Sequence, residues 1–231
     1  MKYKTILFDA DGVLFDYRKA ESFAFLKTFD FFKIKENLDF IHKKYKTINA
    51  KIWREFEEKK ITSIDLRVER FSRLFKATHL KLDPVKVSKT YLKFLSECSF
   101  LIDGAEEIVE YFSEKCELAI ITNGLADVQR SRIGNSRLAS FFKRLFISEE
   151  IGYPKPHKEI FEFTLRNLKT KNKKDILLVG DNLVSDIKGG NDFGIDTCWF
   201  NQNIWNNKLD IHPTYEINNL LELKKIVGVR S

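Results

Sequence analysis

Two aspartates, Asp9 and Asp11, stand one residue apart directly after a short apolar run, Thr5 to Phe8. In an extended strand, residues two positions apart face the same side, so the two carboxylates would lie close together. A hard divalent cation with oxygen ligands would relieve the repulsion between them. The pair therefore suggests a metal-assisted reaction, although such a pair also occurs in a capped turn that follows a strand.

Polar residues also follow the later apolar runs of the chain. They are Thr122 and Asn123 after 118–121, Lys155 in the loop after 145–147, and Asp181 after 176–179, with Asp186 five positions further on. Lys155 stands between two prolines, which fix the backbone on both sides and can direct its side chain inward. The ends of parallel strands share one edge of a sheet, so the sequence predicts that these side chains converge at one site.

This set of side chains is suited to phosphoryl transfer. We expect Mg²⁺ held by Asp9, Asp11 and Asp181, because this ion favours a few carboxylates together with water and substrate phosphate. Asp9 would attack phosphorus and form an aspartyl-phosphate. Asp11 would protonate the leaving oxygen and then accept a proton from the water that cleaves the intermediate. The phosphoryl oxygens would be bound by Lys155, Thr122 and Asn123.

The elements that must position these residues alternate between strands and helices after Gly104. The apolar runs 118–121, 145–147, 176–179 and 198–200 predict strands, of which the last closes the series, and 157–168 predicts an amphipathic helix. Repeated units of this kind predict an α/β protein with a Rossmann-like, doubly wound parallel sheet.

Residues 17–99 show only helical spacing of apolar residues, and they predict a helical cap inserted into a core made of residues 1–16 and 100–231. Such an insertion would lie over the carboxyl ends of the strands, where α/β proteins bind ligands. The cleft between the two parts could be lined by Phe15, Asp16, Tyr17 and Trp53. A Trp in an amphipathic helix is more often a core residue, so the sequence leaves a base-stacking role for Trp53 open.

The composition limits the classes of partner. The 231 residues carry a formal net charge of +7 and a pI of about 9.1, but Lys is mixed with Asp and Glu along most of the chain. We therefore expect solvated basic faces that attract a small anion, and no nucleic-acid partner. Three widely spaced cysteines do not predict a disulfide framework. With no signal peptide and no membrane-spanning run recognised, we expect a cytoplasmic protein.

Four segments resemble, in the expected order, the motifs of the haloacid dehalogenase superfamily. They are Phe8–Asp16, Ile121–Gly124, Lys155 with its following Pro-His, and Gly180–Asp186. The resemblance implies Asp9 as nucleophile, Asp11 as acid/base, and Mg²⁺ bound by Asp9, Asp181 and the main-chain carbonyl of Asp11, with Asp186 orienting Lys155. Dehalogenases of the superfamily lack an acidic residue at the position of Asp11, so its presence favours phosphate chemistry. Val13 replaces a Thr found in many members, as it does in some phosphatases and phosphomutases.

A closer resemblance extends into the helical insert. Segments such as Tyr45–Asn49, Trp53–Glu57 and Ile147–Gly152 are similar to the YjjG/YfnB-like branch, which implies 5′-nucleotidase activity on pyrimidine nucleoside monophosphates. A phosphatase or phosphomutase for small sugar phosphates is the alternative, because the core motifs contact only the phosphoryl group. A non-catalytic protein that binds nucleic acid is the third reading. The sequence leaves the base, the sugar, the substrate contacts of the insert and the oligomeric state open.

Overall fold

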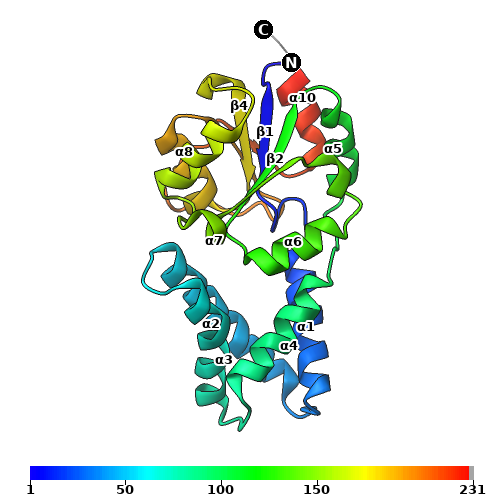
Figure 1. Ribbon diagram of the computed structural model, residues 1–231, viewed down its shortest axis with the longest axis vertical. Coiled ribbons are helices and arrows are strands. Elements are labelled where there is room, and N and C mark those ends of the chain that lie inside the picture. The colour runs from blue at the N-terminus through cyan, green and yellow to red at the C-terminus, as the bar shows by residue number, and fades with distance from the viewer. Residues whose placement is uncertain (229–231) are drawn as a thin grey trace.

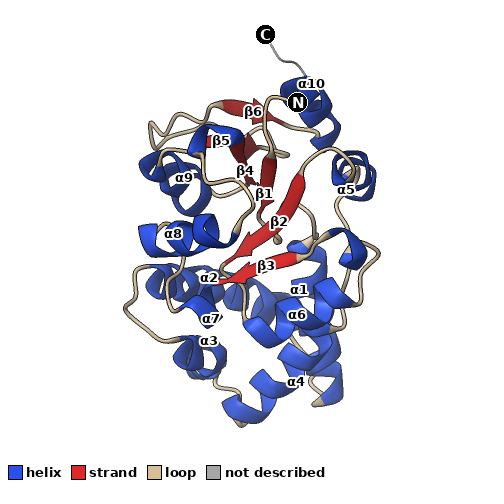
Figure 2. Ribbon diagram, turned by 45° about the horizontal axis from the view of Figure 1, so that its top comes forward, coloured by secondary structure: helices blue, strands red, loops and turns tan. Residues whose placement is uncertain are grey.

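The computed structural model describes residues 1–228, and its centre is a six-stranded parallel sheet with the strand order β3-β2-β1-β4-β5-β6 (Figure 2). The strands are β1 (Thr5–Phe8), β2 (Glu117–Thr122), β3 (Arg144–Ile147), β4 (Ile176–Gly180), β5 (Asp196–Phe200) and β6 (Tyr215–Ile217). Strand β1 is buried along its whole length and pairs with β2 on one side and β4 on the other. The chain therefore winds outward in both directions from β1, and a crevice opens at the carboxyl end of that strand.

Helices cover both faces of this sheet, as Figure 1 shows. One face packs against α5 (Ala105–Ser113) and α10 (Leu223–Gly228), through a cluster that includes Phe8, Phe112 and Val227. The other packs against α8 (Lys158–Asn167) and neighbouring α9 (Gly189–Phe193), through Phe161 and Leu178. Shorter elements complete the core: α6 (Ala126–Gly134), α7 (Ser148–Ile151), a π-helical turn (Leu183–Lys188), and 3₁₀ turns at Ala139–Phe141, Lys173–Asp175 and Leu220–Glu222. The predicted doubly wound α/β core is confirmed.

Four helices between β1 and α5 form a separate layer, which we call the helical unit: α1 (Tyr17–Phe31), α2 (Leu38–Glu57), α3 (Ser63–Thr78) and α4 (Pro84–Ser96). Polar caps begin its first and last helices, since the Asp16 carboxylate accepts the Lys19 N–H at α1 and the Asp83 carboxylate accepts the Val85 N–H at α4. The unit has its own apolar cluster, in which the rings of Phe25, Tyr45 and Phe71 stack or tilt against one another. Figure 1 places it beyond the carboxyl ends of β1 and β2.

One detail of the sheet differs from the expectations. Residues 198–200 do not close the sheet, because β6 pairs with β5 in parallel as a short edge strand. Its sequence, Tyr-Glu-Ile, has no apolar run that would signal a strand.

Within residues 1–228, no helix combines the length and apolarity required to span a membrane.

Candidate active site

Asp9 is the first residue after β1, and its position is fixed by the sheet. Its N–H donates to the Val179 carbonyl (2.9 Å), and its Oδ1 accepts the N–H of Ala10 (2.8 Å). The same oxygen lies 2.9 Å from the ammonium of Lys155. Burial raises the pKa of Asp9 well above its ordinary value, and the charge of Lys155 opposes that shift. The result is a carboxylate with one paired oxygen at the floor of a pocket.

Lys155 is almost completely buried and has three acceptors. Its Nζ donates to Asp186 Oδ1 (2.6 Å) and to the Ile121 carbonyl (2.9 Å), in addition to the pairing with Asp9. Burial lowers the pKa of Lys155, but the charges of Asp186 and Asp9 outweigh it and raise the pKa overall. The side chain is therefore a permanent cation at the base of the site, and Asp186 orients it.

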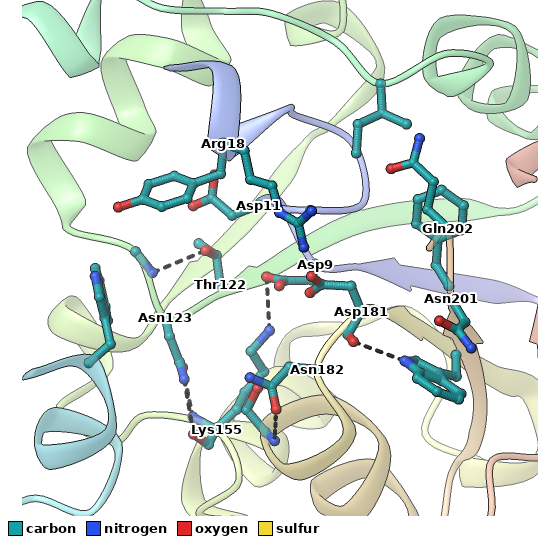
Figure 3. A pocket seen from close by; sticks show the side chains of 18 of the residues that line it. Asp9, Asp11, Arg18, Thr122, Asn123, Lys155, Asp181, Asn182, Asn201 and Gln202 are labelled. Atoms are coloured by element: carbon teal, nitrogen blue, oxygen red, sulfur yellow. Dashed lines mark hydrogen bonds and ion pairs between the residues drawn. The ribbon is translucent and has the colours of Figure 1, made fainter. Parts of the chain in front are cut away.

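Thr122 and Asn123 end β2 beside this pair (Figure 3). Thr122 is buried, and its hydroxyl oxygen accepts the Gly124 N–H (3.1 Å) while lining the pocket. The Asn123 side chain forms two hydrogen bonds with the Lys155 backbone: Nδ2 donates to the Lys155 carbonyl (2.9 Å), and Oδ1 accepts the Lys155 N–H (2.8 Å). The Asn123 side chain therefore aligns the Lys155 loop, and its phosphate contact stays a prediction.

A cluster of three carboxylates lies at the same strand ends. One oxygen from each of Asp9, Asp181 and Asp186 can be chosen so that all three lie within 4.8 Å of one another. Burial, and then the charge of Asp186, raise the pKa of Asp181 to about 7. Gly12 makes room for this group, because its φ is +81° and a Cβ on it would lie 2.3 Å from Asp181 Oδ2. The carboxylate oxygens are crowded, and Lys155 is the cation beside them. Such a set of oxygen donors fits a hard divalent ion such as Mg²⁺.

Because the carboxylates crowd one another at Asp181, removing the charge of Asp181 should stabilise the protein. A folded-state pKa of about 7 lies above the ordinary value of about 3.9, so the stability linked to this group is present at low pH and lost as pH rises through about 7. Because Asp181 is solvent-exposed and its charge is therefore partly screened, we expect Asp181→Asn in the metal-free protein at pH 8 to raise Tm by only about 1–2 °C, with a smaller gain near pH 5. Calorimetry with a chelator tests this, with the exposed Asp192→Asn as the control. An unchanged or lower Tm at pH 8 would contradict it.

Asp11 is held apart from this cluster. Its Oδ2 accepts a hydrogen bond from Gln129 Nε2 (2.6 Å), and its Oδ1 forms a short ion pair with Arg132 Nη2. Among residues 1–228, the carboxylate group that could hold a metal does not include Asp11. The Asp11 side chain thus lies outside the carboxylate cluster, and both of its oxygens accept hydrogen bonds.

A pocket of about 410 Å³ opens over these groups, between the core and the helical unit. Of the four residues predicted to line the cleft, the structure places Asp16, Tyr17 and Trp53 on its wall. Phe15 is a correction, because it is fully buried in the core cluster under the sheet, where the Arg132 guanidinium lies over its ring at 5.0 Å. The turn after Asp11 directs its ring inward, away from the pocket.

Sequence reasoning missed several lining residues. Arg18, Arg54 and Glu57 reach the pocket from α1 and α2, and Asn201, Gln202, Asn203 and Trp205 reach it from the loop after β5. That loop follows a parallel strand, so the strand-end argument that found Asp181 also applied to it. Glu57 also touches the core: its Oε1 accepts from Asn123 Nδ2 (3.3 Å), and its carbonyl contacts His157 Nε2 (3.1 Å).

Residues 3–194 match the model of the haloacid dehalogenase-like hydrolases. The chain belongs to this family. The match covers the four motifs and confirms the predicted superfamily. It also confirms the prediction that this protein is a hydrolase.

Three relatives match this haloacid dehalogenase-like hydrolase over nearly the full length of both chains. HAD-hydrolase YfnB of Bacillus subtilis is 38% identical over 100% of this chain and 97% of its own length. Pyrimidine 5′-nucleotidase YjjG of Escherichia coli is 31% identical, covering 98% and 99%, and pyrimidine 5′-nucleotidase PynA of Streptococcus pneumoniae is 33% identical, covering 96% and 94%. A crystal structure of YfnB bound to magnesium superimposes with a TM-score of 0.91 over 99% of this chain and 100% of that one. The predicted branch is thereby confirmed.

Proposed function

We propose that this enzyme is a Mg²⁺-dependent phosphatase that acts through an aspartyl-phosphate, with pyrimidine nucleoside 5′-monophosphates as its substrates. The observation that carries the proposal is the Asp9 carboxylate at the pocket floor, 2.9 Å from a buried Lys155 and within the carboxylate cluster. A nucleophile, a fixed cation and a candidate metal site next to one another are the parts that phosphoryl transfer requires.

The side chains divide the reaction between them. An Asp9 oxygen forms a bond to phosphorus as the ester P–O bond breaks, and Asp11 gives its proton to the leaving oxygen. Water then attacks the aspartyl-phosphate, its proton passes to Asp11, and Asp9 and inorganic phosphate are released. Lys155 and the Thr122 hydroxyl stabilise the charge on the phosphoryl oxygens. Asp9 and Asp181 would hold Mg²⁺, with the Asp11 carbonyl as a further ligand, and the bound ion would neutralise phosphate charge.

The pocket supports a nucleotide as the occupant. Its volume lies within the usual range for small-molecule sites, roughly 300–1,000 Å³. Beyond the phosphoryl site it offers aromatic walls from Tyr17 and Trp53, and amides from Asn201, Gln202 and Asn203. An aromatic face and several amides suit a flat base with donor and acceptor edges. YjjG and PynA, two relatives that match over nearly the full length, are pyrimidine 5′-nucleotidases.

We also infer that residues 17–99 act as a cap over the core of residues 1–16 and 100–231. The helical unit supplies Tyr17, Arg18, Trp53 and Glu57 to the pocket, and the core supplies the reacting groups. Closure of such a unit over bound substrate would exclude water and select the leaving group.

Phosphate release from a panel of substrates with Mg²⁺ tests the proposal. UMP, dUMP and dTMP should be preferred over hexose and triose phosphates. A preference for the sugar phosphates would select the alternative function on the same core. Loss of activity on addition of a chelator, restored by Mg²⁺, is expected in either case. Salt-sensitive nucleic-acid binding without any phosphatase activity would favour the non-catalytic reading.

Trp53 allows a sharper test of the base. The residue is half-buried, packs edge-on against Phe56 at 5.8 Å, and also lines the pocket. If it contacts the base, Trp53→Ala should raise KM for UMP about 10-fold, because stacking on an aromatic ring contributes about 1–3 kcal/mol. Turnover of 4-nitrophenyl phosphate should stay within about twofold. Phe31→Ala, at an exposed position of α1, is the matched control; equal effects on both substrates would contradict a base contact.

A further inference from the structure

Helix α6 presents two polar side chains, Gln129 and Arg132, to the interior of the protein. Both are about 1% exposed. Burying a guanidinium and an amide is unfavourable unless each finds partners. Neither side chain lines the pocket, and the chemistry assigned above makes no use of them. Their partners therefore indicate why they are there.

Both side chains meet at the carboxylate of Asp11. Gln129 Nε2 donates to Asp11 Oδ2 (2.6 Å) and lies 3.3 Å from the Thr122 hydroxyl. Arg132 Nη2 donates to Asp11 Oδ1 and to Gln129 Oε1 (3.2 Å), so the two side chains also bind each other. The ring of Phe15 supports the guanidinium from one side.

The surrounding chain is shaped for this contact. A Cβ on Gly124 would lie 2.0 Å from Gln129 Nε2, so a glycine after Asn123 is what lets the amide approach. Arg132 Nε and Nη1 have no hydrogen-bond partner within residues 1–228. A buried guanidinium with unpaired nitrogens destabilises the fold, so its position is better explained by the orientation of Asp11 than by stability.

We propose that Arg132 and Gln129 are positioning residues that keep the Asp11 side chain available for proton transfer. The inference rests on the proposed function, in which Asp11 is the acid/base. A carboxylate that joined Asp9, Asp181 and Asp186 would become a metal ligand and could not exchange protons with the leaving group. By binding both oxygens on the Thr122 side of the site, Arg132 and Gln129 separate Asp11 from the cluster.

The two residues have unequal parts. Arg132 can only donate, so it keeps its place on Oδ1 whether or not Asp11 carries a proton. Gln129 holds Oδ2 through one amide hydrogen bond, and the same amide is itself held by Arg132. We therefore assign the orientation of Asp11 mainly to Arg132, with Gln129 as the second support.

The leaving group provides a test that a merely structural role would not pass. Ribose 5′-oxygen needs a proton as it leaves, whereas 4-nitrophenolate does not. Arg132→Met should lower kcat for UMP about 100-fold, in the range of general acid catalysis, with KM changed less than about threefold. The first-turnover burst of 4-nitrophenol from 4-nitrophenyl phosphate should slow less than about threefold. Asp11→Asn should show the same dependence on the leaving group, and Arg132→Lys should recover part of the loss.

The controls separate this inference from the proposed function. Arg130→Met removes an exposed arginine from the same helix, paired with Glu150, and should change neither substrate. If Arg132→Met does not fold, Arg132→Lys and Gln129→Leu carry the same comparison. Equal losses on both substrates, or a loss confined to KM, would overturn the positioning role. The proposed function would be overturned instead if the wild-type enzyme were inactive on both substrates, or if the Asp9→Asn variant were as active as the wild type.

Discussion

Replacing Asp9 with Asn should reduce phosphate release by at least about 10⁴-fold, because the amide cannot attack phosphorus or replace the anionic oxygen beside Lys155. The fold should persist, since Asn keeps the N–H donated to Val179 and an oxygen for the Ala10 N–H. Burial raises the pKa of Asp9, so loss of its charge should not destabilise the protein. Steady-state kinetics on UMP measure the loss of activity, and thermal unfolding measures the stability of the variant.

A trapping experiment makes this expectation specific to the nucleophile. Wild-type enzyme quenched in acid during turnover of ³²P-labelled UMP should carry label, and Asp9→Asn should carry none. Asp210→Asn, at an exposed loop position, is the control that should behave as wild type. Labelling of the Asp9 variant would show that another residue accepts the phosphoryl group.

Replacing Lys155 with Ala should have a large effect on stability as well as activity. The substitution leaves Asp9 and Asp186 buried without the ammonium that lies 2.9 and 2.6 Å from them. Removing one partner of a buried ion pair costs about 3–5 kcal/mol, and the loss of a fixed charge on the phosphoryl group should lower kcat about 10³-fold.

The stability lost on Lys155→Ala should increase with pH. Asp9, whose pKa burial already raises, can take up a proton as pH falls, and the unpaired negative charge then disappears. The loss should therefore be greatest at pH 8 and smaller at pH 5.5 in urea unfolding. Lys158→Ala, three positions along the chain at an exposed site, is the matched control and should lose less than about 1 kcal/mol. A loss that does not vary with pH would point to packing of the lysine stem as its source.

The parallel sheet explains why so much of the site was predictable. Apolar runs mark strands buried on both faces, and the ends of parallel strands lie at one edge, so the residues after each run had to meet. Asp9, Thr122, Lys155 and Asp181 were placed together by this argument without any contact being known, and the structure lines one pocket with all four. The strand-end rule thus predicts which residues converge.

Side-chain direction within the turns was beyond this argument. Phe15 was expected in the cleft because it follows the catalytic turn, but a turn sends neighbouring side chains to opposite sides, and its ring entered the core. Asn123 ends the correct strand, yet its amide contacts the Lys155 backbone. Arg132 and Gln129 were missed because polar residues of a helix are normally exposed, and nothing in the sequence of α6 shows that both side chains approach Asp11.

The pocket contains every tryptophan of the chain. The sequence has three, and Trp53, Trp199 and Trp205 all line the same cavity, from α2, from β5 and from the loop after β5. The indole of Trp199 also donates to the main-chain carbonyl of Asp181, next to the carboxylate cluster. The tryptophan fluorescence of the protein therefore originates at one location. Metal or substrate occupancy can be followed from emission intensity alone, without an attached dye.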